Sequence, residues 1–375
     1  MIKVAYYISD YGWGHAARSI CIIEKLLEYE PELRVIVCTK QPMPFLEAAL
    51  SNIIDMSYEQ EQVSFHPIQN DVGFVSHEIT GQVDLVATCH KVNPWVYSWN
   101  DYLRSEYKFL KRQKVDMIIS DIPPQPFLLA EKLKCPGIAI TNFSWVDQYP
   151  KHHFPQALLE RLREAYAKAT LAFVLPFNFE LEVFRSRVQT PLVARNPTRT
   201  PTELRQELGI ESHQFLVYIG VGLSVSNPFV FETVAAVVAA RKDEIVFLAS
   251  GKMTASQENV YKVPLDDPNG QDFIACSDLA LLKPAYSSVA EAIRSKTPIL
   301  SYNIAQSREG YLIEHQIITL GFAQAISRRE FNTGEWIKKI DIQDDLRKNY
   351  AQIPPRFQHQ GETFVAAQIL KLLEN

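Results

Sequence analysis

The stretch KVAYYISDYGWGHAAR, residues 3–18, decides the fold class of this chain. An apolar run enters a glycine turn and continues into a segment with helical spacing, which is typical of the strand, turn and helix that open a Rossmann-like unit. A second stretch, LVYIGVG at residues 216–222, repeats the strand and the glycine turn. We therefore predict an α/β protein with two tandem Rossmann-like domains.

Short apolar, β-branched runs alternate with longer stretches of helical period on both sides of these turns, which predicts mostly parallel sheets. A stretch rich in Pro and Thr at residues 196–202 separates the two series and is interpreted as the linker. The amphipathic segment Gly361–Leu373 predicts a terminal helix. The expected strands are Lys3–Ile8, Arg34–Cys38, Asp116–Ser120, Gly137–Thr141, Leu171–Leu175, Phe215–Ile219, Glu244–Ala249, Leu279–Leu282 and Pro298–Tyr302.

Composition narrows the class of protein. The 375 residues are 47% hydrophobic and 22% charged, which indicates a folded globular chain rather than a disordered one. The formal net charge of −5 supplies no basic field for nucleic acid. The five cysteines are scattered without a C-x-x-C pair, and neither a signal peptide nor a membrane-spanning segment is expected. These features predict a cytoplasmic protein, and contact with a membrane surface stays open.

The segment Gly12–Ala17 fits the G-x-G-x-x-[G/A] fingerprint of dinucleotide-binding turns, in which the backbone approaches a phosphate at a helix N-terminus. A nicotinamide site usually has an acidic residue after the second strand, but this strand ends at Cys38-Thr39-Lys40. A dehydrogenase is therefore disfavoured.

His15 stands where this turn meets the helix, and Asp121 directly follows another expected strand. If the two side chains meet, the carboxylate can orient one ring nitrogen and leave the other as a general base. Two structural alternatives remain: His15 caps the helix, and Asp121 is an N-cap or Asx-turn in the proline-rich loop that follows.

Aromatic residues gather in the first half of the chain. They occur in the loop Asn142–Tyr149 and at Trp95, Tyr97 and Trp99. Such side chains could form stacking walls for a ring-shaped ligand, while core packing is the alternative for each of them.

The block KPAYSSVAE, residues 283–291, predicts a strand end, a turn with hydroxyl groups and a helix that begins near Ser287. Backbone N–H groups at that helix start, together with Ser288 and Lys283, make an anion cradle suited to a diphosphate. Glu291 lies one turn further and could accept hydrogen bonds from ribose hydroxyls. Helix capping by the serines and a solvated surface position for Glu291 are the alternatives.

These motifs together resemble the GT-B nucleotide-sugar glycosyltransferases, and most closely the glycosyltransferase-like branch that includes the N-terminal part of plant arabinokinases. A more distant likeness extends to the peptidoglycan N-acetylglucosaminyltransferase and the UDP-glycosyltransferases. The resemblance rests on residues 14–18, 121–124, 142–145 and 283–291, which occur in the expected order through nearly the whole chain.

The resemblance implies two Rossmann-like domains facing across a cleft. It assigns residues 1–195 to an acceptor-binding domain, 196–355 to a nucleotide-sugar-binding domain, and 356–375 to a helix that packs back on the first. It implies His15 as catalytic base, supported by Asp121. The acceptor-binding residues expected are Trp13, Trp95, Asn142 and Trp145. The donor-binding residues expected are Gly14, Gly220, Gly222, Ser224, Lys283, Tyr286, Ser287, Ser288, Glu291, Arg308 and Glu309.

The expected activity is that of an inverting, metal-independent transferase of hexosyl or N-acetylhexosaminyl type, with no cofactor beyond the substrate nucleotide sugar. The sequence contains no Asp-x-Asp, and a UDP-linked donor is favoured by resemblance alone. Where many relatives have an Asp-Gln or Gln-Gln sugar-contact pair, this chain has Arg308-Glu309, so the donor sugar is not implied. The acceptor could be a glycan, a lipid or a small molecule. A GT-B epimerase and a non-catalytic nucleotide-sugar-binding protein are the alternatives.

Overall fold

The computed structural model describes residues 2–56, 62–77, 80–221, 241, 243–250, 258–264 and 267–374. The chain folds into two compact units, each built around a parallel sheet. The first unit contains Met1–Val75, Asp84–Val193 and His359–Asn375, and the second contains Ser76–Val83 and Ala194–Gln358. The chain therefore enters the second unit briefly at residues 76–83, and its C-terminal end returns to the first.

The first unit holds a seven-stranded sheet in the order β3-β2-β1-β6-β7-β8-β9 within the described residues. Its neighbouring strands are parallel, because each is followed by a crossover rather than by a hairpin. The strands are β1 (Lys3–Ile8), β2 (Arg34–Thr39), β3 (Val63–Pro67), β6 (Met117–Asp121), β7 (Gly137–Thr141), β8 (Leu171–Val174) and β9 (Arg187–Gln189).

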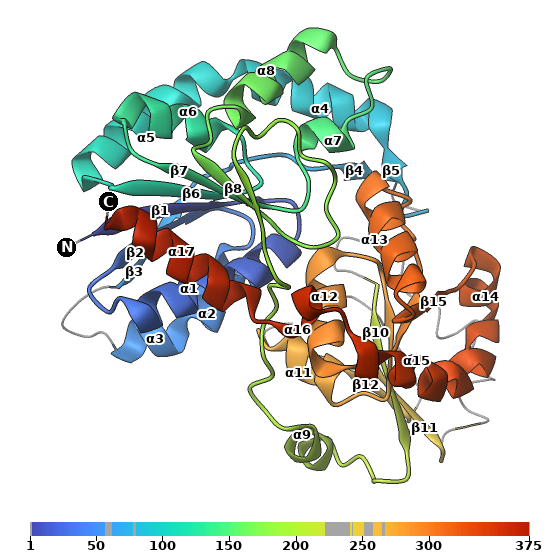
Figure 1. Ribbon diagram of the computed structural model, residues 1–375. Coiled ribbons are helices and arrows are strands. Elements are labelled where there is room, and N and C mark those ends of the chain that lie inside the picture. The colour runs from blue at the N-terminus through green and yellow to red at the C-terminus, as the bar shows by residue number, and fades with distance from the viewer. Residues whose placement is uncertain are drawn as a thin grey trace. The chain divides into compact units, whose positions relative to one another are not determined.

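Helices cover both faces of this sheet, as Figure 1 shows. One face carries α5 (Trp99–Gln113), α6 (Gln125–Leu133) and α8 (Gln156–Tyr166), and the other carries α1 (Gly14–Tyr29) with the terminal helix α17 (Gly361–Leu373). The remaining helices of the unit are α2 (Met43–Ala49), α3 (Ser51–Met56), α4 (Leu85–Tyr97) and α7 (Trp145–Gln148).

Helix α17 begins with a close backbone approach. The Gly361 amide donates to the carbonyl oxygen of Leu192 at 2.9 Å. A Cβ atom at position 361 would lie 2.3 Å from the carbonyl oxygen of Pro191, so only glycine allows this contact. The buried side of α17 then packs against α1.

The second unit holds a six-stranded parallel sheet in the order β12-β11-β10-β13-β14-β15 within the described residues. The strands are β10 (Phe215–Gly220), β11 (Ile245–Ala249), β12 (Val260–Lys262), β13 (Leu279–Leu282), β14 (Ile299–Ser301) and β15 (Ala323–Ala325). The two short strands β4 (Val75–Ser76) and β5 (Val83–Asp84) pair with each other at the excursion of the chain.

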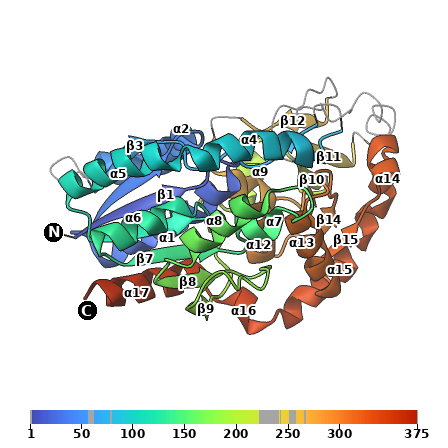
Figure 2. The same cartoon turned by 90° about the horizontal axis from the view of Figure 1, so that it is seen from above.

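Helices also alternate with the strands of the second unit. They are α9 (Pro201–Glu207), α11 (Gly270–Ala275), α12 (Tyr286–Ser295), α13 (Arg308–Thr319), α14 (Arg328–Thr333), α15 (Gln343–Asn349) and α16 (Pro355–Gln358), with 3₁₀ segments η1 (Glu335–Ile342) and η2 (Tyr350–Gln352). Figure 2 shows α14 and α15 beyond the edge strand β15. Trp336 of η1 is fully buried against one face of the sheet.

The prediction of two Rossmann-like sheets is confirmed, and the expected central strands agree with the structure to within one or two residues. The missed strands β3, β4, β5, β9, β12 and β15 are short or lie toward the sheet edges, where a continuous apolar run is not needed. The expected linker includes a helix start: the Thr200 side chain and Glu203 form a capping box around Pro201, the first residue of α9.

Candidate functional site

The carboxyl ends of β1 and β6 bring two residues of the predicted site together. The strands are parallel neighbours with Ile8 opposite Asp121, so the turn after β1 and the end of β6 meet at one edge of the sheet. In this turn Gly12 adopts a positive φ of 78°, a conformation that favours glycine, and α1 begins two residues later. His15 therefore stands in the first turn of α1, beside the end of β6.

His15 and Asp121 are in direct contact. The Nδ1 atom of His15 lies 3.0 Å from Oδ1 of Asp121, and the Asp121 side chain is completely buried. Neither of the capping alternatives describes what these side chains do: no side chain caps the start of α1, and α6 begins after Pro124 without a side-chain cap. The structure thus places His15 and Asp121 as a pair, and their catalytic roles stay predictions.

Arg18 is the third member of this cluster, and no role was predicted for it. Its guanidinium donates to both oxygens of Asp121, from Nε to Oδ2 and from Nη2 to Oδ1, each at 2.6 Å. Its Nη1 donates to Oδ1 of Asn142 at 2.8 Å, and Ser19 Oγ donates to Asp121 Oδ2 at 3.3 Å. The spacing could have linked Arg18 to His15, because residues three apart lie on one face of a helix. Arg18 is also a cation in an otherwise apolar stretch.

The electrostatics of the cluster fix the proton on His15. Burial alone would raise the pKa of Asp121, but the charge of Arg18 and the hydrogen bonds from His15 and Arg18 lower it below the usual value. Asp121 is thus ionised at neutral pH and can only accept hydrogen bonds. Nδ1 of His15 must therefore carry the hydrogen, which leaves Nε2 of the neutral ring as an acceptor. Within the described residues Nε2 has no hydrogen-bond partner.

The backbone directly after Asp121 is strained. Ile122 has a φ of 83°, which is rare for a β-branched residue. Its carbonyl oxygen accepts a hydrogen bond from the Tyr166 hydroxyl at 2.9 Å, and the same hydroxyl accepts the backbone amide of Trp145 at 3.1 Å. Strain of this kind persists where surrounding contacts enforce it, which is common at functional sites.

A second buried carboxylate, Asp71, lies at the same edge of the sheet. It accepts hydrogen bonds from Ser9 Oγ at 2.6 Å, from the amide of Asp10 at 2.9 Å and from Nε1 of Trp145 at 3.2 Å. Burial, followed by the neighbouring charge of Asp10, raises the pKa of Asp71 to about 6, while Ser9 and His15 act in the opposite direction. No motif marked Asp71, since it lies in the irregular segment after β3.

Asp10 closes the β1 turn by accepting hydrogen bonds from neighbouring backbone. Its Oδ1 accepts the amides of Lys40 at 2.9 Å and Gln41 at 2.7 Å, and its Oδ2 accepts the amide of Asn70 at 2.6 Å. These bonds satisfy both oxygens of a buried side chain. These hydrogen bonds connect the turn that carries His15 with the segment after β2 and with the segment after β3.

The predicted acceptor residues fall into different environments. Asn142 is fully buried and bonded to Arg18, and Trp145 is fully buried in an aromatic cluster with its ring stacked on Tyr149 at 5.1 Å. Trp145 therefore positions Asp71 instead of presenting a ring at the surface. Trp13 is half-buried against Phe45, and Trp95 is half-buried in α4. Their contact with an acceptor stays a prediction.

In the second unit, α12 begins beside the end of β13 as an uncapped helix. Its N-cap residue is Ala285, without a side-chain cap, so Ser287 and Ser288 lie inside the first turn instead of capping it. The helix begins at Tyr286, which is buried, as is Ser287. The N-terminus of a helix carries partial positive charge, which suits an anion.

Lys283 stands at the end of β13, where its amide donates to the carbonyl of Gly220 at 3.0 Å. Burial lowers the pKa of Lys283, and the charge of Glu309 acts in the opposite direction. Within the described part of the chain its ammonium group makes no ion pair. Gly220 has no room for a side chain, because a Cβ atom would lie 2.6 Å from the Tyr218 ring.

Glu291 forms an ion pair with Arg195, a residue for which no role was predicted. The Nε atom of Arg195 donates to its Oε1 at 2.8 Å, and both side chains are buried. Nη1 of Arg195 also donates to the carbonyl of Pro268 at 2.6 Å. Glu291 is therefore not the solvated surface charge of the alternative reading, and its second oxygen, Oε2, makes no hydrogen bond among the described residues.

The other predicted donor residues lie in both units. Gly14 is exposed at the first position of α1 in the first unit, and Arg308 and Glu309 open α13 after the N-cap Ser307. Gly222 and Ser224 lie outside the described residues.

Among the described residues, no cluster of three His, Cys, Asp or Glu side chains could hold a metal ion. None of the helices that the structure describes has the length and apolar character needed to cross a bilayer.

Residues 2–340 match the family described as glycosyl transferase family 1, and the chain belongs to this family. It is 23% identical over 354 residues to the L-arabinokinase of Arabidopsis thaliana, covering 92% of this chain and 32% of that protein. The chain thus spans about a third of the length of this relative.

Solved structures of low sequence identity share the fold along the whole chain. Arabidopsis thaliana UGT89C1 complexed with UDP superposes with a TM-score of 0.68 at 13% identity, covering 100% of this chain and 99% of that one. Phytolacca americana UGT2 complexed with UDP-2fluoro-glucose and pterostilbene gives 0.65 at 12% identity, covering 100% of each. These likenesses confirm the expected GT-B fold, and with the family match they confirm the resemblance noted in the sequence.

Replacing Arg18 by Met should strongly destabilise the first unit, because the Asp121 carboxylate then stays buried without its cation. Breaking a buried pair in this way costs about 3–5 kcal/mol. Urea unfolding followed by tryptophan fluorescence measures this, since four of the five tryptophans belong to the first unit. The double variant R18M/D121N should recover part of the loss. An unchanged midpoint for R18M would contradict the assigned pair.

Replacing Asp71 by Asn should change how stability depends on pH. The folded state raises the pKa of Asp71 from 3.8 to about 6, so this group stabilises the fold fully below about pH 4 and loses that contribution as pH rises through 6. The difference corresponds to about 3 kcal/mol. The stability of D71N minus that of the natural chain should therefore increase between pH 4 and pH 7, and a difference that is constant with pH would refute the assignment.

Proposed function

We propose that this chain is an inverting, metal-independent glycosyltransferase that moves a sugar from a UDP-linked donor to an acceptor hydroxyl. Membership of glycosyl transferase family 1 supports the reaction class. The single observation that carries the mechanism is the buried contact among Arg18, Asp121 and His15, because it presents Nε2 of His15 as a proton acceptor.

In the proposed reaction, Nε2 of His15 takes the proton of the acceptor hydroxyl. The acceptor oxygen attacks the anomeric carbon from the side opposite the diphosphate, and the bond to the diphosphate breaks with its electron pair remaining on the leaving oxygen. One displacement of this kind inverts the anomeric centre. The resulting imidazolium is stabilised by Asp121, which stays ionised because Arg18 pairs with it. General base catalysis of this type contributes about 10²–10⁴-fold.

The start of α12 is proposed to hold the diphosphate of the donor. Its N-terminus lacks a side-chain cap, Ser287 and Ser288 supply hydroxyls, and Lys283 supplies a cation at the end of the neighbouring strand. Fixed donors and charges aimed at a leaving group stabilise it without a metal ion. Oε2 of Glu291, held in place by Arg195, is proposed to accept a ribose hydroxyl.

The base of the donor is proposed to be uracil. Support comes from the relatives of the same fold that were solved with UDP and with UDP-2fluoro-glucose. Arg308 and Glu309 at the start of α13 are proposed to contact the donor sugar, while Gly14, Trp13 and Trp95 are proposed as contacts in the first unit.

His15→Gln should lower the transfer rate by about 10²–10⁴-fold, because the base is lost. UDP binding, measured by isothermal titration, should stay within about twofold, since His15 is not among the groups proposed to hold the diphosphate. Asp121→Asn tests the partner but also breaks the pair with Arg18, so its folded fraction must be measured first. A transfer rate for H15Q equal to that of the natural chain would overturn the base assignment.

Lys283→Gln should weaken UDP binding by about tenfold or more, because one charge-assisted contact to phosphate is lost. Lys338→Gln is the matched control, since Lys338 is an exposed lysine of η1 in the same unit. Equal affinities of the two variants for UDP would remove Lys283 from the proposed cradle.

A further inference from the structure

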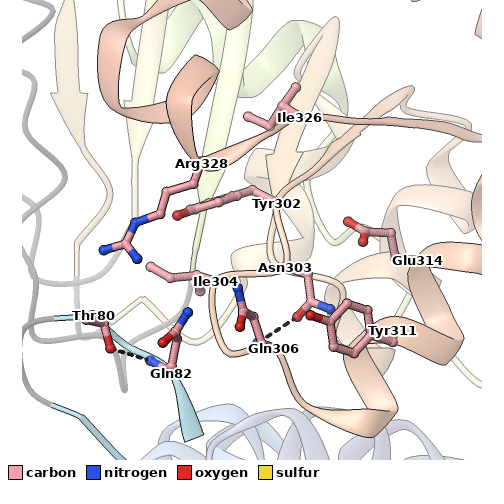
Figure 3. Close-up of a pocket in the computed structure, with 10 residues that line it drawn as sticks. All are labelled: Thr80, Gln82, Tyr302, Asn303, Ile304, Gln306, Tyr311, Glu314, Ile326 and Arg328. Atoms are coloured by element: carbon pink, nitrogen blue, oxygen red, sulfur yellow. Dashed lines mark hydrogen bonds between the residues drawn. The ribbon is translucent and has the colours of Figure 1, made fainter.

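A hollow of about 540 Å³, its open mouth included, lies in the second unit beside the carboxyl ends of β14 and β15 (Figure 3). Its walls come from the segment after β14, from α13 and the start of α14, and from Thr80 and Gln82 of the chain excursion. The excursion is held by a hydrogen bond from the amide of Val83 to the carbonyl of Ala305 at 3.1 Å. Among the residues that the structure describes, none of those proposed to bind the donor lines this hollow.

Three polar groups in the hollow have no partner among the described residues. The guanidinium of Arg328 makes no ion pair or hydrogen bond there, and neither does the hydroxyl of Tyr302. Nδ2 of Asn303 is buried without an acceptor. By contrast, the adjacent Arg329 points to an ion pair with Glu335 at 3.4 Å. An unmade hydrogen bond at a buried donor is costly, so this wall has unused binding capacity.

The side chains around these groups are held in place. The ring of Tyr302 stacks on Phe331 with centroids 4.1 Å apart, and Oδ1 of Asn303 accepts the amide of Gln306 at 3.1 Å. Figure 3 shows Arg328 reaching beside Tyr302, with Glu314 on the opposite side of Tyr302 and Asn303. Since the aromatic ring and the amide are fixed, little side-chain entropy remains to be lost when a ligand binds.

Glu314 supplies a carboxyl group at the far end. Its Oε1 accepts a hydrogen bond from Ser301 at 2.7 Å. Burial raises the pKa of Glu314, and the bond from Ser301 acts in the opposite direction. The hollow therefore has a cation at one end, an acid at the other and amides between them, so it suits a ligand with one negative charge at one end and hydroxyl groups along its length.

We propose that this hollow binds a saccharide residue that carries a carboxylate, at a site separate from the donor cradle. Arg328 and the Tyr302 hydroxyl take the carboxylate, since a guanidinium fork matches its geometry. The amides of Gln82, Asn303 and Gln306 take ring hydroxyls, because an amide can both donate and accept. A phosphate dianion fits less well, because Arg328 is the only cation among the described residues that line the hollow and Glu314 would repel a second charge.

The test compares methyl β-D-glucuronide with methyl β-D-glucoside by ligand-detected NMR titration of the full chain. The natural chain should bind the glucuronide about tenfold more tightly than the glucoside, because one charge-assisted contact distinguishes them. Arg328→Gln should abolish that preference, and Tyr302→Phe should reduce it. Arg329→Gln, the neighbouring arginine outside the hollow, should leave it unchanged.

Saturating UDP should leave the glucuronide affinity unchanged, because the donor cradle is built from other residues. The proposal is overturned if the natural chain binds neither sugar, binds both equally, binds glucose 6-phosphate more tightly than the glucuronide, or loses the glucuronide when UDP is added. It is overturned as well if R328Q and R329Q behave alike. The titration measures only equilibrium binding. It therefore tests the proposal even if the chain transfers no sugar.

Discussion

The buried pair between Arg18 and Asp121 is the interaction on which the first unit's site depends. A carboxylate with no exposed surface costs free energy unless a cation and hydrogen bonds compensate it, and Arg18 supplies both through two contacts of 2.6 Å. Because Asp121 then stays ionised, it can hold His15 in one tautomer. The same guanidinium binds Asn142, so the ends of two strands and the start of α1 form one polar cluster.

The meeting of His15 and Asp121 could be predicted because both follow strands whose carboxyl ends open at the same edge of a parallel sheet. Spacing places Arg18 on the helix face of His15, but its bond to Asp121 could not be predicted, because the two residues are 103 positions apart in the chain. Asp71 carried no signal at all: it lies in an irregular segment, and only the folded chain brings Ser9 and Trp145 around it.

The same limit applies to the fold. Central strands such as β7 are buried on both faces and read as apolar runs, whereas β9 and β15 lie at the sheet edges and carry polar residues. No sequence motif predicted the excursion of residues 76–83 into the second unit. The candidate site shows the same limit. The position of Glu291 in α12 was predictable, but its ion pair was not, because Arg195 lies in a segment without regular structure.

The central claim is that Asp121, held ionised by Arg18, fixes the hydrogen of His15 on Nδ1. Nitrogen-15 NMR of histidine side chains measures this directly in the folded chain, with the His15 signals assigned by their loss in H15Q. In the neutral ring, Nδ1 should show the shift of a protonated nitrogen and Nε2 that of an unprotonated one. A neutral ring protonated on Nε2 would contradict the account, because the nitrogen proposed as the base would already carry a hydrogen.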